Sequence, residues 1–296
     1  MAGWDEIFEE VQQANCLDRK TTEYLKKLQE KTGRNIVVYF SAWQQKVGIG
    51  GDYSITDDDR NGFMSALKGL DKTRGLDLIL HTPGGDLSAT TSIVEYLFAF
   101  FNGDIRVIVP STAMSAGTMI ACAAKEIIMG LHSNLGPIDP QINGAPANEY
   151  IELLKKAQDD IANNRNINYW IQILQKYAPT FYGVCEKAIK MSKKYAFDWL
   201  KRGMMSGGCD EDINSVVEFL SDYNKNLNHN TRFCIKELQD KTGLKIKALE
   251  DDSELQDLVL SIYHCFVILA TTTQVNKIIE NNNGKKYIRN SNIILR

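Results

Sequence analysis

Residues 76–85 (LDLILHTPGG) and residues 105–118 (IRVIVPSTAMSAGT) decide the fold of this chain. Each stretch is an apolar run typical of a β-strand, followed by a turn and then by a helix-like segment. A repeated order of strand, turn and helix is typical of a parallel sheet with right-handed crossovers. Because the carboxyl ends of parallel strands meet at one edge of the sheet, both turns are expected at that edge, where α/β proteins place their chemistry.

The pattern extends on both sides of these stretches. A β-type run over residues 36–40 precedes them, and a short one over residues 126–129 follows. The spacing of apolar residues predicts helices over residues 4–29, 57–70, 87–101 and 148–161, the first ending near Gly33. Residues 41–56 are expected to form a loop or hairpin, and the polar residues 281–296 a loosely ordered tail. The apolar run 258–273 is short for a bilayer and is expected to be a buried or interface helix.

Ser115 lies in the second turn, between a strand and a helix. A serine held in such a turn presents its hydroxyl at the sheet edge, next to unpaired N–H groups of the following helical turn. Gly84 and Gly85, in the first turn, let a second backbone segment approach the same point, because glycine has no side chain and tolerates positive φ. The pair predicts a nucleophile beside an oxyanion hole. Taken singly, a serine at a helix start is usually only a helix cap, and a Pro-Gly-Gly sequence is usually only a turn.

Three motifs carry a resemblance to a known family. They are HTPGGD at residues 81–86, AMSAGT at residues 113–118 and LGPIDPQ at residues 135–141, in that order. The stretch from residue 76 to residue 141 resembles the serine dehydrogenase proteinase family, a branch of the ClpP/crotonase superfamily close to signal peptide peptidase A. The resemblance implies an α/β fold with a ClpP/crotonase-like spiral β-α-β core and a helical accessory region.

The resemblance also implies an activity. It indicates a serine-type endopeptidase with Ser115 as nucleophile, and an oxyanion hole from the Pro-Gly-Gly turn (Gly84, Gly85) and the amide of Ala116. The turn around Ser115 departs from the G-x-S-x-G pattern, since Ala113 takes the place of the first glycine, which disfavours an α/β-hydrolase. No cofactor and no metal are implied.

The general base is left open by the sequence. Where ClpP-like enzymes carry their catalytic histidine, this chain has an isoleucine followed by Asp139, so a ClpP-type triad is not expected. Peptidase A relatives use a lysine about forty residues beyond the serine, which points to Lys155 and Lys156; both flank the apolar stripe of their helix, as surface lysines also do. His81 and His229 are further candidates, and each is equally explained as a structural residue.

Composition is that of a water-soluble enzyme. The 296 residues are 44% hydrophobic and 24% charged, with a net charge of −3. The sequence has no stripe of basic residues, so nucleic acid is not expected as a partner. The six cysteines form no C-x-x-C pair, and this favours reduced thiols and a cytoplasmic location. The amino terminus does not resemble a signal peptide, so no direct membrane span is expected.

We expect four segments: an N-terminal helix (1–34), the core with the serine turn (35–147), a helical insertion or lid (148–228), and a closing segment with a helix and a polar tail (229–296). The expected partners are a peptide or unfolded-protein substrate, further copies in a homo-oligomer, and an unidentified regulatory partner. Two other functions remain open on the same scaffold: a crotonase-like acyl-CoA enzyme, for which Asp86 and Asp139 offer carboxylates, and a non-catalytic oligomeric binding protein.

Overall fold

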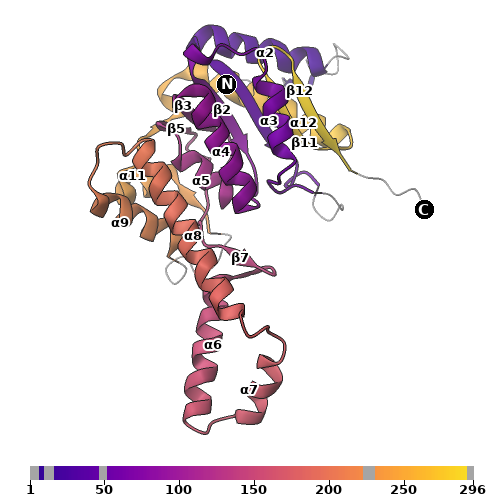
Figure 1. Cartoon of the computed structure of the whole chain (residues 1–296). Helices are drawn as coiled ribbons and strands as arrows, with labels where there is room; N and C mark the ends of the chain where they lie inside the picture. The colour runs from indigo at the N-terminus through magenta and orange to yellow at the C-terminus, as the bar shows by residue number, and fades with distance from the viewer. Residues whose placement is uncertain (1–6, 10–16, 47–51, 223–230, 292–296) are drawn as a thin grey trace, which may run out of the picture.

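A seven-stranded sheet forms the centre of the protein (Figure 1). A computed structural model describes residues 7–9, 17–46, 52–222 and 231–291 of the chain. The strand order is β10-β5-β3-β2-β1-β11-β12; the first five strands run parallel, and β11 and β12 are antiparallel to their neighbours. The strands are β1 (Asn35–Ser41), β2 (Leu76–His81), β3 (Ile105–Val109), β5 (Glu126–Met129), β10 (Ile246–Ala248), β11 (Val275–Asn281) and β12 (Lys286–Asn290).

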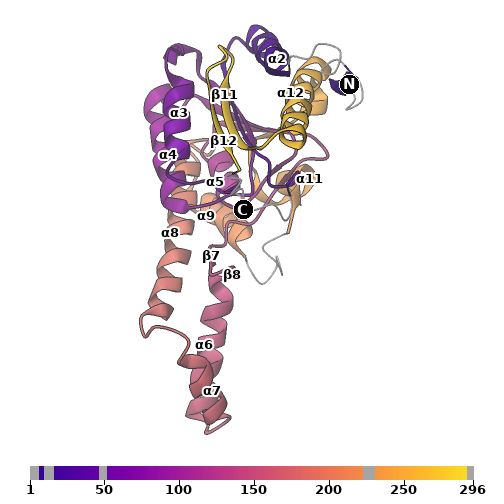
Figure 2. The same ribbon diagram turned by 90° about the vertical axis from the view of Figure 1, so that its right-hand side faces the viewer.

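Both faces of the sheet are covered by helices (Figures 1 and 2). Alternate residues of a strand point to opposite faces, so Leu78 and Leu80 of β2 join one core and Ile79 the other. On the first face lie α3 (Asp59–Leu67), α4 (Leu87–Phe101), α5 (Ala116–Cys122), part of α8 (Phe181–Arg202), α9 (Asp210–Ser221) and α11 (Ile235–Thr242). On the second face lie α2 (Leu17–Thr32) and α12 (Ser253–Thr272).

Smaller elements complete the chain. A three-stranded sheet joins β4 (Thr112–Ala113), β6 (Asn134–Leu135) and β9 (Phe233–Cys234), and a hairpin joins β7 (Gln141–Ile142) to β8 (Ala145–Pro146). Two short 3-10 helices span Lys72–Arg74 and Leu249–Asp251. We call α6 (Ala147–Ala162), α7 (Ile167–Leu174) and the first half of α8 the arm, because they extend together away from the body in both views (Figures 1 and 2).

The parallel α/β class predicted from the sequence is confirmed, together with strands β2, β3 and β5 and the helix between the two turns. The expectation of a loosely ordered tail is wrong for residues 286–290, which pair with β11 as the edge strand β12. Strand β11 was not expected, because its sequence VNKIIEN places Asn, Lys and Glu in a buried strand. The first predicted helix falls partly outside the described residues, but α2 ends at Thr32 before Gly33, as expected.

Helix α12 is long and apolar enough, by length and composition, to cross a membrane, and it is the only such helix among the described residues. Half of its apolar window is buried inside the protein. Ile262 and Phe266 pack in the core between α12 and the sheet, which agrees with the prediction of a buried helix.

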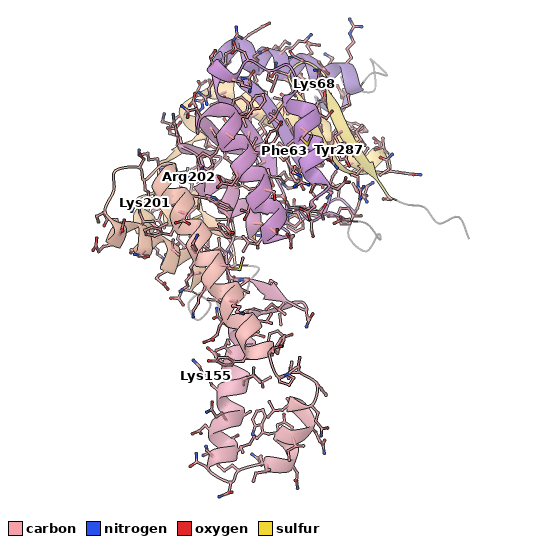
Figure 3. The ribbon with its side chains drawn as sticks, in the orientation of Figure 1. Phe63, Lys68, Lys155, Lys201, Arg202 and Tyr287 are labelled. Atoms are coloured by element: carbon pink, nitrogen blue, oxygen red, sulfur yellow. The ribbon has the colours of Figure 1, made fainter. Side chains whose placement is uncertain are left out.

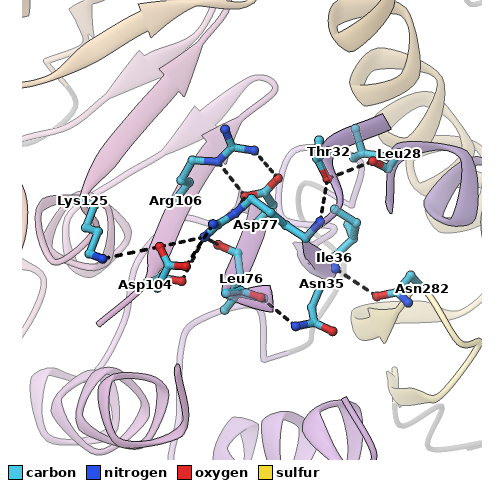
Figure 4. Close-up of polar contacts among 12 residues, drawn as sticks. Leu28, Thr32, Asn35, Ile36, Leu76, Asp77, Asp104, Arg106, Lys125 and Asn282 are labelled. Carbon is cyan, nitrogen blue, oxygen red and sulfur yellow. Dashed lines mark hydrogen bonds and ion pairs between the residues drawn. The ribbon is translucent and has the colours of Figure 1, made fainter. Parts of the chain in front are cut away.

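A buried carboxylate links β2, β3 and the residue that precedes β1, at the end of the strands opposite the two turns (Figure 4). Asp77 of β2 is fully buried and lies between two guanidinium groups: Arg34 Nε at 2.7 Å and Arg106 at 2.8 and 2.6 Å. Arg34 also contacts Asp104, which precedes β3. The arrangement fixes the start of β2 against β1 and β3, and thereby the register with which these strands reach the other edge.

Replacing Asp77 with alanine is expected to lower the free energy of unfolding by about 3 kcal/mol, because two partly buried guanidinium groups lose their shared carboxylate. Urea unfolding followed by circular dichroism measures the change. Asp210→Ala is the matched control: it removes an exposed ion pair with Lys201 and is expected to cost less than about 1 kcal/mol. Equal losses in the two variants would show that the buried ion pairs of Asp77 stabilise the protein no more than an exposed ion pair does.

Candidate active site

Backbone pairing brings the two turns together. Beyond the ends of β2 and β3, Thr82 and Ala113 form a parallel bridge. Thr82 donates its N–H to the carbonyl of Thr112 at 3.1 Å, and its own carbonyl accepts the N–H of Met114 at 3.0 Å. The Pro-Gly-Gly turn and the serine turn are therefore hydrogen-bonded to one another, and not merely present at the same edge.

Ser115 occupies a rare backbone conformation. Its φ of 51° and ψ of −115° lie in a region that residues with a side chain seldom adopt. Such a conformation costs on the order of 1–3 kcal/mol and is found mainly at functional sites. The Ser115 side chain is partly exposed, caps nothing in α5, and makes no hydrogen bond with any residue that the structure describes. The hydroxyl is free to meet a ligand.

Gly84 lies against the serine. A β-carbon added at Gly84 would lie 2.7 Å from the carbonyl oxygen of Met114 and 2.8 Å from Cβ of Ser115, and φ at this position is 95°. Only glycine allows this approach and this conformation. The two turns thus meet through backbone contact, which no side chain at position 84 would permit.

Two amides remain unpaired beside the hydroxyl. Across the described part of the chain, neither the N–H of Gly85 nor that of Ala116 donates a hydrogen bond. The carbonyl of Gly84 accepts the N–H of Ile55 at 2.8 Å. In a trans peptide the C=O and N–H point in opposite directions, so the Gly85 amide points away from Ile55. Two free donors next to a free hydroxyl are the arrangement that stabilises an oxyanion.

A cavity of about 390 Å³ opens beside Ser115. One side carries Ser115, Ala116 and the turn from Pro83 to Leu87. The far wall is built largely of small or apolar residues of α5, of the loop after β6, of β7 and of α8. Within it, Ser192 of α8 donates its hydroxyl to the carbonyl of Ile138 at 2.6 Å. These wall residues are Met119, Ile138, Pro140, Gln141, Ala188 and Ser192.

The predicted lysines lie on the arm. Lys155 and Lys156 are exposed on α6, and Figure 3 shows Lys155 well away from the body. Lys155 lines a separate cavity with Glu152 and Glu218, while the cavity beside Ser115 contains no lysine or histidine among its described lining residues. The structure therefore does not bring either lysine to Ser115 within one chain.

His81 faces the other side of the sheet. Its ring lies among Phe40, Trp43 and Tyr263, at 5.1 to 6.3 Å between ring centroids, in the layer covered by α12. Burial lowers the pKa of His81 to about 4, so the ring is neutral at pH 7. The structure places His81 away from the cavity and in a packing position.

The remaining candidates are Asp139 and His229. Asp139 is buried, accepts a hydrogen bond from Gln141 at 2.9 Å and does not line the cavity. His229 lies outside the described residues. No group of three or more His, Cys, Asp or Glu among the described residues is arranged to hold a metal ion.

Some cavity residues were not predicted from the sequence. Ser54 lines the cavity and Ile55 pairs with Gly85, but nothing in the stretch 41–56 distinguishes them from a loop. Ala188 and Ser192, with Ala196, are small residues four positions apart on one face of α8. That spacing is a signal for a close helix contact, and it was available in the sequence.

A family model described as ClpP-like SDH-type serine proteinase matches residues 7–259, which is most of the chain. The chain belongs to this family. The description of the family names serine proteinases with a ClpP-like fold. The resemblance inferred from the three motifs is confirmed.

Curated relatives come from an archaeon. The chain is 32% identical over 180 residues to uncharacterized protein MJ0137 and 30% identical over 147 residues to uncharacterized protein MJ1495, both of Methanocaldococcus jannaschii. These matches cover 60% and 50% of this chain, and span 58% and 46% of the two relatives. Among solved structures, a mutant of the 1510-N membrane-bound stomatin-specific protease aligns with a TM-score of 0.38 at 18% identity, over 69% of this chain and 79% of that one.

The strain at Ser115 makes a testable difference between two variants that lack the hydroxyl. Ser115→Gly relieves the conformation at φ 51°, whereas Ser115→Ala keeps it. We expect the glycine variant to be more stable than the alanine variant by about 1 kcal/mol. Urea unfolding of both proteins measures this difference. An alanine variant as stable as the glycine variant would mean that the backbone relaxes without cost.

The buried His81 predicts acid sensitivity. Its folded pKa lies below the unfolded value, so the unfolded chain binds the proton first as the pH falls from 6.5 toward 4, and stability is lost in that window. Between pH 7 and pH 5 the loss due to this residue is about 2 kcal/mol. His81→Leu is expected to reduce the pH dependence of unfolding by that amount. If the pH dependence of unfolding is unchanged in His81→Leu, the acid sensitivity comes from other titratable groups.

Proposed function

We propose that the protein is a serine endopeptidase that cleaves peptide bonds in peptides or unfolded proteins. The observation that carries the proposal is Ser115, held in a strained turn with a free hydroxyl beside the free amides of Gly85 and Ala116. The family assignment supports the serine class, and the apolar cavity wall supports a peptide substrate with an apolar side chain next to the cleaved bond.

In the proposed reaction, the Ser115 oxygen attacks the peptide carbonyl carbon while its proton passes to a base. The amides of Gly85 and Ala116 donate to the carbonyl oxygen as it becomes negative. Removing one such donor typically costs a factor of about 10² to 10³ in rate. The base then protonates the leaving amine, and water hydrolyses the acyl-enzyme at the same site.

A neutral lysine or a histidine serves as the base in this proposal. The candidates are Lys155, Lys156 and His229, since His81 lies on the other face of the sheet. Because the two lysines lie on the extended arm, their participation needs a second copy of the chain or a movement of the arm. A homo-oligomer, a cytoplasmic location and a regulatory partner belong to the same proposal.

A fluorophosphonate probe tests the nucleophile. We expect the purified chain to be labelled once, at Ser115, and Ser115→Ala to lose the labelling and about 10³-fold or more of any activity on unfolded casein. Labelling that survives Ser115→Ala would contradict the assignment. Cleavage that is absent while acyl-CoA esters bind at micromolar concentration would favour the crotonase-like alternative.

The same probe identifies the base. Labelling rates of Lys155→Ala, Lys156→Ala and His229→Ala are compared across pH 5 to 10, with Lys201→Ala, an exposed lysine elsewhere on the surface, as the control. Loss of the alkaline rise in rate in one variant only would name the base.

A further inference from the structure

Lys277 is a lysine sealed inside the protein. It lies on β11, is 2% exposed, and falls outside the residues 7–259 matched by the family model. A buried ammonium group is costly unless it is paired and hydrogen-bonded. The proposed reaction gives this lysine no role, and its strand was not predicted from the sequence.

The ammonium group of Lys277 is both paired with a carboxylate and hydrogen-bonded to the backbone. Its Nζ donates to the carbonyl of Ser54 at 2.8 Å and lies 3.1 Å from both carboxylate oxygens of Asp59, which is 1% exposed. Asp59 Oδ2 also accepts the hydroxyl of Tyr39 at 3.0 Å and the N–H of Thr56 at 2.9 Å. The ion pair therefore holds two backbone groups, one on each side of Ile55.

Those two groups belong to the peptide units that pair with the Pro-Gly-Gly turn. The N–H of Ile55 donates to the carbonyl of Gly84 at 2.8 Å, and the carbonyl of Ile55 accepts the N–H of Asp86 at 2.9 Å. In a trans peptide the C=O and N–H point in opposite directions. Each peptide unit of Ile55 is thus bonded at both ends, to the buried ion pair on one side and to the turn on the other.

This bonding sets the direction of the Gly85 amide. While the Gly84 carbonyl is held by Ile55, the Gly85 N–H in the same peptide unit points the other way, on the side where Gly84 lies against Ser115. A Gly-Gly peptide rotates easily if it is not held, because neither residue has a side chain to oppose it. The bridge between Ile55 and Gly85 opposes that rotation.

The hairpin that carries Lys277 is itself fixed on α3. Tyr287 of β12 donates its hydroxyl to Asp58, and Arg289 lies 2.6 Å from the same carboxylate. Tyr287 also packs against the core cluster that contains Phe63 of α3; both residues are labelled in Figure 3. Lys277 thus lies on a hairpin that is bonded to the start of α3.

We propose that Lys277 is a positioning residue for the oxyanion site: with Asp59 it holds residues 54–56 against the Pro-Gly-Gly turn and so keeps the Gly85 amide directed toward Ser115. The inference rests on the proposed function for its catalytic consequence. Its mechanical part, a link from the C-terminal hairpin to Gly85, stands without that function.

The main variant is the double substitution Lys277→Met with Asp59→Asn, which removes the ion pair and the bond to the Ser54 carbonyl without leaving a buried unpaired charge. Lys277→Arg keeps the charge, and Lys286→Met removes a lysine from the neighbouring strand β12, where it pairs with Glu280. All proteins are assayed well below the unfolding temperature of the least stable one.

The kinetic readout is kcat and KM on a peptide ester, with the rate of fluorophosphonate labelling. We expect the double variant to lose about 10- to 100-fold in kcat and in labelling rate with KM nearly unchanged, because the far wall of the cavity comes from other elements. Lys277→Arg should retain most of the rate, and Lys286→Met should stay within about twofold. A double variant with full kcat would overturn the proposal.

Hydrogen exchange measured by mass spectrometry distinguishes failure of the proposed function from failure of the link between Lys277 and the Pro-Gly-Gly turn. In the double variant, peptides that contain residues 54–56 and 84–86 should exchange at least about tenfold faster, since the bridge that pairs the Ile55 and Asp86 amides is expected to open more often. Faster exchange in a protein whose wild type has no serine reactivity would reject the proposed function and keep the link. Unchanged exchange would reject the link itself, whatever the activity.

Discussion

The site depends on one short piece of backbone pairing, the bridge between Thr82 and Ala113. Strands β2 and β3 deliver the two turns to the same edge of the sheet, but this bridge continues their pairing past the strand ends. The bridge thereby places the backbone of Gly84 in contact with the serine turn. Parallel strands are hydrogen-bonded in only a few registers, and a shift by one residue would turn each side chain to the opposite face.

The sequence could predict the part of the fold that local patterns specify. Apolar runs such as residues 76–80 and 105–109 predict buried parallel strands, and the glycines that follow predict turns, because both depend on neighbouring residues only. The positions of Ser115, Gly84 and Gly85 at one edge follow from the same patterns. The family resemblance adds the serine class, since it rests on three motifs in a fixed order.

The rest depends on partners far away in the chain. Strand β11 contains a lysine that is tolerated inside only because Asp59, more than two hundred residues earlier, neutralises it. Residues 52–56 look like a loop, and their pairing with Gly85 appears only when α3 and β11 are in place. The general base was the hardest part to predict. Lys155 and Lys156 lie on the arm, and the position of the arm relative to Ser115 depends on the tertiary structure and not on neighbouring residues.

Helix α8 is a single element of 22 residues, about 33 Å long. Its first turns stand in the arm, packed with α6 around Cys185, while Ala188 and Ser192 form part of the cavity wall and Trp199 is anchored in the core. The helix is continuous from the arm to the core, so the arm and this part of the cavity wall belong to one stiff element. A displacement of the arm along α8 would therefore also shift Ala188 and Ser192.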